Sequence, residues 1–316
     1  MSNIKPIADL SYRNYDGPLK KPGSRWWVIA KNGIRIALKK KALWFWMFGS
    51  AWYYLAMLVG LFFFQQVSSA NPPIKQAMQA FLERIVWQDQ FLHGFSFGQM
   101  AMLIISLMLG SGSIADDNRS NAMLIYLSKP CAKREYLFGK WVGIALPVFV
   151  IMVIPTIVFY AYGALTFREY GFLKDAWLLP KMLVIIPIAA MLHASIVVGI
   201  SSMFNQGRNA SATYAGLYFL GYFFTSLMGG IWASSRGETT YPVRHLFYGS
   251  IDGILIGVCK AIVGTNGSPP FGIQNPGRMS QVPAPNVAAI LGIALLISVV
   301  FVLIAWRKIR AVEVIG

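Results

Sequence analysis

Residues 182–207 read MLVIIPIAAMLHASIVVGISSMFNQG, a run of 26 residues without one Asp, Glu, Lys or Arg. A helix needs about 20 apolar residues to cross the hydrocarbon core of a bilayer. Five more charge-free runs exceed 25 residues, at 42–74, 90–115, 141–167, 209–235 and 279–306. We therefore expect an all-α integral membrane protein with six transmembrane helices, at about 43–65, 94–114, 139–166, 179–204, 210–232 and 287–306.

The composition agrees with a membrane protein. Of the 316 residues, 56% are hydrophobic and 13% are charged, whereas a soluble domain carries about 25% charged residues. The 21 Phe, 10 Trp and 14 Tyr exclude disorder. Two cysteines exclude a disulfide scaffold and a four-thiolate metal site. A net charge of +16 would suggest nucleic acid for a soluble protein, but in a membrane protein its distribution matters more, and we expect no nucleic-acid partner.

The basic residues predict the orientation. With six spans, one side of the membrane holds residues 1–42, the 115–140 loop, the 205–209 turn and the tail from Arg307, with 19 basic and 6 acidic residues. The opposite side has 9 basic and 6 acidic residues. The positive-inside rule therefore places both termini in the cytoplasm. We expect a multi-pass protein of the inner (cell) membrane, without a cleavable signal because the first 40 residues are polar and basic.

The chain is expected to comprise a flexible cytoplasmic lead (1–24), an amphipathic helix (25–41), one transmembrane domain (42–306) and a cytoplasmic tail (307–316). On a helical wheel the polar residues of 25–41 share one arc. The helix would lie in the membrane interface, with the Trp residues at headgroup depth and the basic residues near anionic lipid. Its marker residues are Trp26, Trp27, Lys31, Arg35 and Lys39. The alternative is a basic flank that only fixes topology.

Two outer loops are long. Residues 66–93 contain apolar positions at helical spacing, which predicts a short amphipathic helix. The loop 233–286 is the longest, and its apolar stretch 246–263 is interrupted by Asp252 and Lys260. We expect that stretch to be a re-entrant helix or hairpin, or to pack on the spans, rather than to cross. An accessory protein is a candidate partner of this loop.

The loop after the second span, residues 112–140, reads GSIADDNRSNAMLIYLSKPCAKREYLFGK. An acidic-basic cluster is followed by a small residue, an apolar run ending in Ser, a Pro, a basic pair and a Gly-Lys. Asn118 and Ser120 are candidate caps for a short helix around 119–127. The order resembles the permease subunits of ABC-2 type transporters, including the NosY-like permeases. Those usually have Glu near Asp116 or Asp117, and often Gly-Thr in place of Asn121-Ala122.

The resemblance extends to the layout of residues 25–316 and implies a role for the loop. In such permeases a short cytoplasmic helix docks in a cleft of a separate ATPase subunit. The residues that would dock are Asp116, Asp117, Arg119, Asn121, Leu124, Tyr126, Leu127, Ser128 and Pro130. A compact helix with an apolar face and flanking charges suits docking. The alternative is an ordinary cytoplasmic turn made basic for topology.

No Gly-x-x-x-x-Gly-Lys-Ser/Thr motif occurs in the sequence. The chain is therefore not expected to be an ATPase or to bind a cofactor, and ATP and Mg would be held by a partner P-loop ATPase. Six spans are half of the usual twelve in such exporters, which implies two copies of this permease with two ATPase subunits. The histidines are far apart, and we expect neither a catalytic residue nor a metal site.

Several polar residues inside the expected spans are candidates for a substrate path: Gln99, His193, Tyr218, Tyr222 and Thr225. His193 is the titratable side chain deep in a span, which marks a functional candidate. The alternative, which we favour, is a neutral imidazole bonded to a neighbouring helix. The small-residue pairs Ala190/Ala194 and Ser195/Gly199 favour close helix packing, within the chain rather than at a dimer seam.

We interpret the sequence as that of a permease that works by alternating access, most consistent with an exporter. One rival is an ATP-independent secondary transporter or channel, which would have charged residues inside its spans and inverted repeats. We find no Asp or Glu in any expected span. A membrane scaffold that recruits a partner complex is a second rival. A membrane-embedded enzyme is a third, but it would need a nucleophile or metal set that the sequence lacks.

Overall fold

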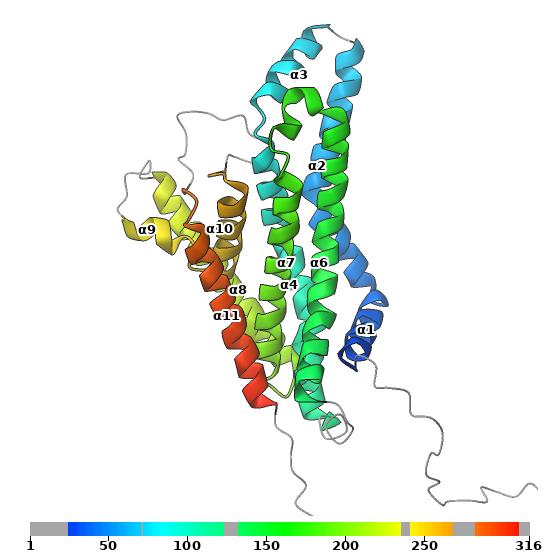
Figure 1. Cartoon of the computed structure of the whole chain (residues 1–316), viewed down its shortest axis with the longest axis vertical. Helices are drawn as coiled ribbons and strands as arrows, with labels where there is room; N and C mark the ends of the chain where they lie inside the picture. The colour runs from blue at the N-terminus through cyan, green and yellow to red at the C-terminus, as the bar shows by residue number, and fades with distance from the viewer. Residues whose placement is uncertain (1–24, 71, 123–131, 235–240, 268–281, 310–316) are drawn as a thin grey trace, which may run out of the picture.

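The computed structural model describes residues 25–70, 72–122, 132–234, 241–267 and 282–309, and these are all-helical, without a strand. The elements are α1 (Arg25–Leu38), α2 (Lys41–Ala70), α3 (Pro72–Arg84), α4 (Trp87–Arg119), α6 (Lys133–Thr166), the 3₁₀ turns η1 (Arg168–Tyr170) and η2 (Phe172–Lys174), α7 (Leu178–Ser201), α8 (Gly207–Ser234), α9 (Tyr241–Leu246), α10 (Ile251–Val263) and α11 (Val287–Lys308). Figure 1 shows the long helices running side by side in one bundle.

Five helices among the described residues are long and apolar enough to cross a membrane: α2, α4, α6, α7 and α11. The sixth expected span, 210–232, lies inside α8, which has 28 residues. Its Gly, Ser, Thr and Tyr content makes α8 less hydrophobic than a typical span, although its only charge is Arg208. The all-α membrane class is confirmed, and the count of six spans stays a prediction.

The segments expected on the cytoplasmic side gather at one end of the bundle. Figure 1 places α1, the end of α4, the start of α6, the turn from α7 to α8 and the last turn of α11 at its lower end. The helix expected within 66–93 is present as α3, and it lies at the upper end with η1 and η2. The described segments that were expected on one side of the membrane therefore lie together in the folded chain.

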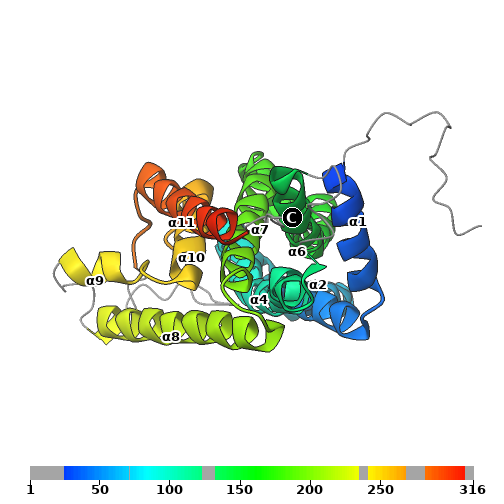
Figure 2. The ribbon, with the colours of Figure 1, turned by 90° about the horizontal axis from the view of Figure 1, so that it is seen from below.

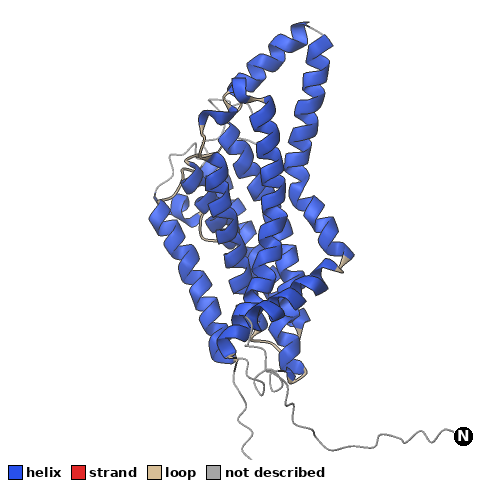
Figure 3. Cartoon of the chain, turned by 45° about the vertical axis from the view of Figure 1, so that its right-hand side comes forward, coloured by secondary structure: helices blue, strands red, loops and turns tan. Residues whose placement is uncertain are grey.

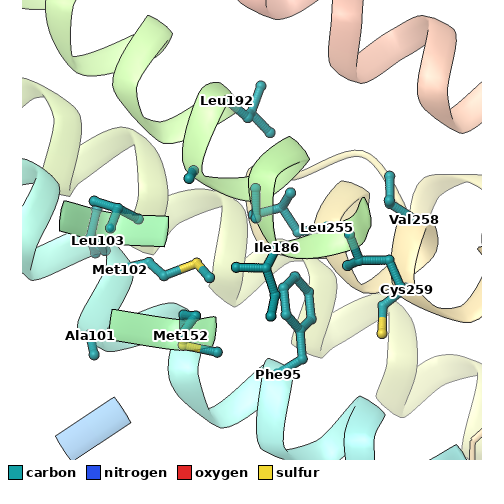
Figure 4. Close-up of a cluster of buried hydrophobic side chains, with 14 of the residues drawn as sticks. Phe95, Ala101, Met102, Leu103, Met152, Ile186, Leu192, Leu255, Val258 and Cys259 are labelled. Atoms are coloured by element: carbon teal, nitrogen blue, oxygen red, sulfur yellow. The ribbon is translucent and has the colours of Figure 1, made fainter. Parts of the chain in front are cut away.

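Helix α7 forms the centre of the bundle. It packs against α4, α6 and α11, and also against α8 and α10. Because it is apolar on all sides, it can be buried all round. Figure 4 shows part of this core, in which Phe95, Met152, Ile186 and Leu255 come from four different helices.

The small residues of α7 pack within the chain. Ala190, Ala194 and Ser195 are buried, and a Cβ built on Gly199 would lie 2.7 Å from the Phe301 carbonyl oxygen of α11. These positions therefore serve internal packing, as the sequence favoured, and none is available for a dimer seam.

The apolar stretch 246–263 forms α10 for most of its length. Helix α10 packs on α4, α7, α8 and α11. It begins with the Ser250 side chain capping the Gly253 amide and ends at Gly264, whose φ of 84° favours glycine. Thirteen residues are too short to cross a bilayer. The contacts show that α10 packs on the long helices, and a re-entrant position in the membrane stays a prediction.

Helix α1 lies across the lower end of the bundle, as Figures 2 and 3 show. Its Ala30 and Ala37 are buried against α6 and its neighbours. A Cβ on Gly139 of α6 would lie 2.6 Å from the Trp26 carbonyl oxygen, and one on Gly143 would lie 3.4 Å from Ala30 Cα. Two glycines four residues apart therefore allow the backbones to approach closely.

We predict that Gly139→Ala loosens α1 from α6. The new methyl group would meet a backbone carbonyl, which cannot move aside as a side chain can, and overpacking of this kind costs about 1–3 kcal/mol. The purified protein should show a lower Tm and faster proteolysis within α1. Gly292→Ala in α11 is the matched control, because nothing lies within 4 Å of its Cβ position. Equal Tm values for both variants would contradict the close packing.

Candidate functional site

The resemblance directs attention to the last three turns of α4, residues 110–119, which we call the α4 terminus. Asp116, Asp117 and Arg119 lie on these turns, and Asn121 follows them with a left-handed φ of 52°. Asn tolerates this conformation better than most residues. Five of the predicted docking residues lie outside the described residues: Leu124, Tyr126, Leu127, Ser128 and Pro130.

The second span expected at about 94–114 lies inside a longer helix. Helix α4 does not end near residue 114 but continues to Arg119. Ser120 donates a hydrogen bond back to the Asp116 carbonyl at 2.8 Å, and Asn118 donates to the Phe204 carbonyl at 3.3 Å. Asn118 and Arg119 therefore belong to α4, and most of the short helix expected around 119–127 lies outside the described residues. The segment after α4 therefore starts from the end of a continuous 33-residue helix.

Asp117 fastens the α4 terminus to α6. Its Oδ2 lies 2.7 Å from Lys140 Nζ and accepts a 2.6 Å hydrogen bond from the Tyr136 hydroxyl. Lys140 also donates to the Ser113 carbonyl at 2.7 Å. The side chains of the ion pair are only 18% and 19% exposed, so water screens them less than a surface pair. Charge-assisted bonds of this kind are about twice as strong as neutral ones.

Asp116 connects the α4 terminus to α8. Its Oδ1 accepts a hydrogen bond from the Gly207 amide at 3.4 Å. A carboxylate is stabilised at this place because the first turn of a helix carries partial positive charge. The two backbones are also very close, since a Cβ on Gly207 would lie 2.9 Å from Gly112 Cα. Movement of α4 here must therefore displace the start of α8.

Ser201, the last residue of α7, bonds to the backbone of α4. Its hydroxyl accepts hydrogen bonds from the Ile114 and Ala115 amides at 3.1 and 3.0 Å, and donates to the Ser111 carbonyl at 2.7 Å. These three bonds hold the end of α7 against the α4 terminus. Sequence reasoning missed Ser201, because a serine at the end of an apolar helix has no distinctive pattern.

A polar cleft of about 760 Å³ opens beside the α4 terminus, where α1, α6 and α8 converge. Lys40 lines it and donates to the Met108 carbonyl of α4 at 2.8 Å. The other charged or amide side chains around it are Asn32, Asp116, Arg119, Lys140, Gln206 and Arg208. The cleft lies at the basic end of the bundle, so it can accept an acidic segment of a partner.

The α1 markers lie where an interfacial helix needs them. Trp26 is half-buried and packs edge-on against Phe138, with ring centroids 5.0 Å apart. Trp27 is 40% exposed. Lys31, Arg35 and Lys39 are exposed. The helix therefore has a packed side, an exposed apolar side and an exposed basic side.

The candidate path residues are mostly interior. Gln99, His193, Tyr218 and Thr225 are buried, whereas Tyr222 is 51% exposed on α8. Thr225 bonds to the Phe247 carbonyl at 3.2 Å and to the Ser250 hydroxyl. The amide of Gln99 has no hydrogen-bond partner among the described residues. The structure therefore does not bring these five side chains together.

Two of them belong to a buried chain of contacts, Tyr214–His193–Tyr218–Asp252. His193 Nδ1 lies 2.6 Å from the Tyr214 hydroxyl, and its ring lies 6.2 Å from the Tyr218 ring. Tyr218 donates to Asp252 Oδ1 at 3.2 Å. This chain joins α7, α8 and α10, and it agrees with a histidine bonded to a neighbouring helix. Asp252 was read only as a charge that weakens a span, so its partner was missed.

At the opposite end of the bundle, an ion pair at the start of α7 is hydrogen-bonded to α4 through Gln88. Asp175 Oδ2 lies 2.7 Å from Lys181 Nζ and accepts a 3.2 Å hydrogen bond from Gln88. Partial burial raises the pKa of Asp175, but the bonds from Lys181, Gln88 and the Trp177 amide outweigh this effect and hold the pKa below its ordinary value. Helix α4 is thus fixed by carboxylates at both ends.

Together, these features define a multi-pass membrane bundle with a braced cytoplasmic-type helix end and no group of metal-ligating side chains among the described residues. The family model described as ABC-2 family transporter protein matches residues 27–309, and the chain belongs to this family. A comparison with curated proteins returned no match. The chain is therefore the membrane-spanning permease of an ABC transporter and not its ATPase, and the family implies pairing with a nucleotide-binding ATPase subunit.

We predict that Ser201→Ala destabilises the α4 terminus. Two amides and one carbonyl of α4 would lose their partner in a buried place, and an unsatisfied buried group costs about 1–3 kcal/mol. Hydrogen exchange at the Ile114 and Ala115 amides should accelerate and the Tm should fall. Ser202→Ala is the matched control, since the Ser202 hydroxyl bonds only to Gly199 of its own helix. Unchanged exchange in Ser201→Ala would contradict these bonds.

Proposed function

We propose that this chain is one half of an ATP-driven exporter of the inner membrane, with both termini in the cytoplasm. Two copies of the chain would assemble with two P-loop ATPase subunits, which hold the ATP and Mg. Within the family we assign it to the NosY-like permeases on the sequence of residues 112–140. The proposal rests on one observation above all: the α4 terminus is bonded directly to α6, α7 and α8.

In this proposal residues 116–130 dock on the ATPase and transmit its motion. A displacement of this segment would first move Asp116 and Asp117. The Asp117–Lys140 pair passes it to α6, and the Asp116 contact passes it to the start of α8. The Ser201 bonds make the same turns of α4 follow α7. Three long helices would therefore move together between inward-open and outward-open states, as alternating access requires.

Helix α8 is the proposed wall between the two copies and along the substrate path. It has a wide exposed face that includes Leu220 and Tyr222, yet it is not among the helices apolar enough to be a typical span. Its exposed face is mainly apolar, as Leu220 and Phe223 show, and a second copy of the chain would cover it. Gln99, His193, Tyr218 and Thr225 would be reached from this wall only if α8 moves. An accessory protein could bind the outer loop around α9.

The docking segment can be tested with Leu124→Asp combined with Leu127→Asp. A tagged chain solubilised from its native membrane should co-purify with a P-loop ATPase, identified by mass spectrometry and by ATP hydrolysis. The double variant should lose this ATPase at least tenfold, because two carboxylates would face an apolar cleft. Leu246→Asp on α9 is the control, since it is exposed at the other end of the bundle.

The result distinguishes the rival functions. A wild-type chain that purifies without any ATPase under mild conditions would overturn the proposal and favour an ion-coupled carrier or a scaffold. An ATPase that stays bound to the double variant would leave the permease in place but exclude 116–130 as its docking segment.

The pairing of two copies can be tested by cysteine cross-linking. In a chain carrying Cys131→Ser and Cys259→Ala, single cysteines would replace Leu217, Leu220 or Phe223 on α8. Oxidation in the membrane should give covalent dimers for at least one of them. Leu295→Cys on α11, 64% exposed, is the control and should stay monomeric. Dimers formed from α11 and from none of the α8 positions would place the seam elsewhere.

A further inference from the structure

An apolar groove lies between α1, α2 and α6. It has a volume of about 400 Å³ and its walls expose almost no polar atom. Leu38 of α1, Trp44 of α2 and Ile154 of α6 line it and are about half exposed. We call this space the lipid groove. It opens on the outside of the bundle, above the point where α1 crosses α6.

The groove follows from how the chain turns between α1 and α2. The turn is closed by the Lys40 amide bonded to the Ala37 carbonyl at 2.9 Å, and by Trp44 Nε1 bonded to the Leu38 carbonyl at 3.1 Å. These bonds hold α1 across the bundle while α2 rises along it. On the third side, Pro147 of α6 lines the groove and has no amide hydrogen for its own helix. The shape of the groove is therefore set by the packing of these three helices.

A second, basic cavity of about 420 Å³ adjoins the groove. It is lined by Lys31, Arg35 and Lys39, together with Ile34 and Leu38. Ile34 and Leu38 line the lipid groove as well, so the two spaces share a wall. The three basic residues recur every four positions and form one stripe along α1. Nothing in the structure gives them an ion pair or hydrogen bond within the described residues.

The charge around this cavity is of one sign. Residues 25–41 contain six basic residues and no Asp or Glu. Three cations that have no partner in the described part of the chain, next to a carbon-lined groove, match a molecule with a negative head and a hydrocarbon tail. A free phosphate would pair with the cations but leave the apolar groove empty. A zwitterionic lipid would place its own positive charge next to the basic residues.

We propose that this place is a binding site for one anionic phospholipid of the membrane. Its phosphate would lie among Lys31, Arg35 and Lys39, and one acyl chain would occupy the lipid groove past Ile34 and Leu38. The site goes beyond the proposed function and does not depend on it. Because α1 packs on Gly139 and Gly143 of α6, and the same helix carries Lys140, the bound lipid would brace the helix that receives the Asp117 contact.

The test is lipid retention by the purified full-length chain, measured by native mass spectrometry after equilibration with equal amounts of phosphatidylglycerol and phosphatidylcholine of the same acyl chains. The wild type should retain phosphatidylglycerol in preference and gain Tm on its addition. Lys31→Gln, Arg35→Gln and Lys39→Gln together should abolish the preference, since each basic residue near a membrane is worth about fivefold in affinity for anionic lipid.

Two matched controls locate the site. Arg134→Gln, Arg307→Gln and Lys308→Gln together remove the same charge from exposed positions elsewhere, and should leave the preference intact. Ile154→Phe fills the lipid groove, whereas Ile157→Phe enlarges a similarly exposed residue of α6 outside it. Only Ile154→Phe should reduce retention, which keeps the groove testable if the triple variant does not fold.

The proposal is overturned by any of three results. The first is equal retention of the two lipids by the wild type. The second is an equal loss of preference in both charge-removal variants, which would indicate general attraction to a basic protein. The third is unchanged retention in Ile154→Phe, which would mean that no acyl chain lies in the groove.

Discussion

The absence of hydrogen-bonding solvent in a bilayer is the constraint on which this structure depends. Every backbone group inside the hydrocarbon must find a partner in the protein, and the long helices satisfy this within themselves. Near its end, helix α4 is also bonded by side chains from other segments. There the carbonyls of Met108, Ser111 and Ser113 accept bonds from Lys40, Ser201 and Lys140, which come from three different parts of the chain.

This arrangement makes the end of α4 a junction rather than a simple helix terminus. A carbonyl bonded by a neighbouring side chain ties the position of one helix to the other, and a charged donor strengthens the bond. Glycines at 110 and 112 allow the neighbours to come close, as the 2.9 Å approach between Gly112 and the Cβ position of Gly207 shows. The sequence GSGS at 110–113 is therefore a packing device and not a phosphate-binding loop.

Much of the fold could be predicted from the sequence, because charge-free runs such as 182–207 have few alternatives to a membrane helix. The amphipathic pattern of 25–41 likewise predicted α1. A charge pattern does not show tertiary bonds. The charge-free run 90–115 did not reveal that Lys140 and the Gly207 amide bind Asp117 and Asp116, or that α4 continues beyond the expected span to Arg119.

The same limit applies to the candidate site. Asp116, Asp117 and Arg119 were found because their order along the chain resembles a family, and order along the chain is what sequence shows. Ser201 and Asp252 act through partners that are 87 and 34 residues away, so no local pattern marks them. Both occupy positions next to glycine or serine on apolar helices, where a polar side chain looks incidental until its neighbour is known.

The distribution of polar groups separates two roles within the bundle. Around α7, the polar side chains of His193 and Ser201 have partners on neighbouring helices, which favours a rigid unit. Helix α8 instead pairs one buried side, carrying Tyr214 and Tyr218, with a wide exposed side. Helix α8 is bonded to Asp116 at its first turn, to His193 through Tyr214 and to Asp252 through Tyr218. A movement of the α4 terminus would therefore act on α6 and α7 and, through these bonds, on α8.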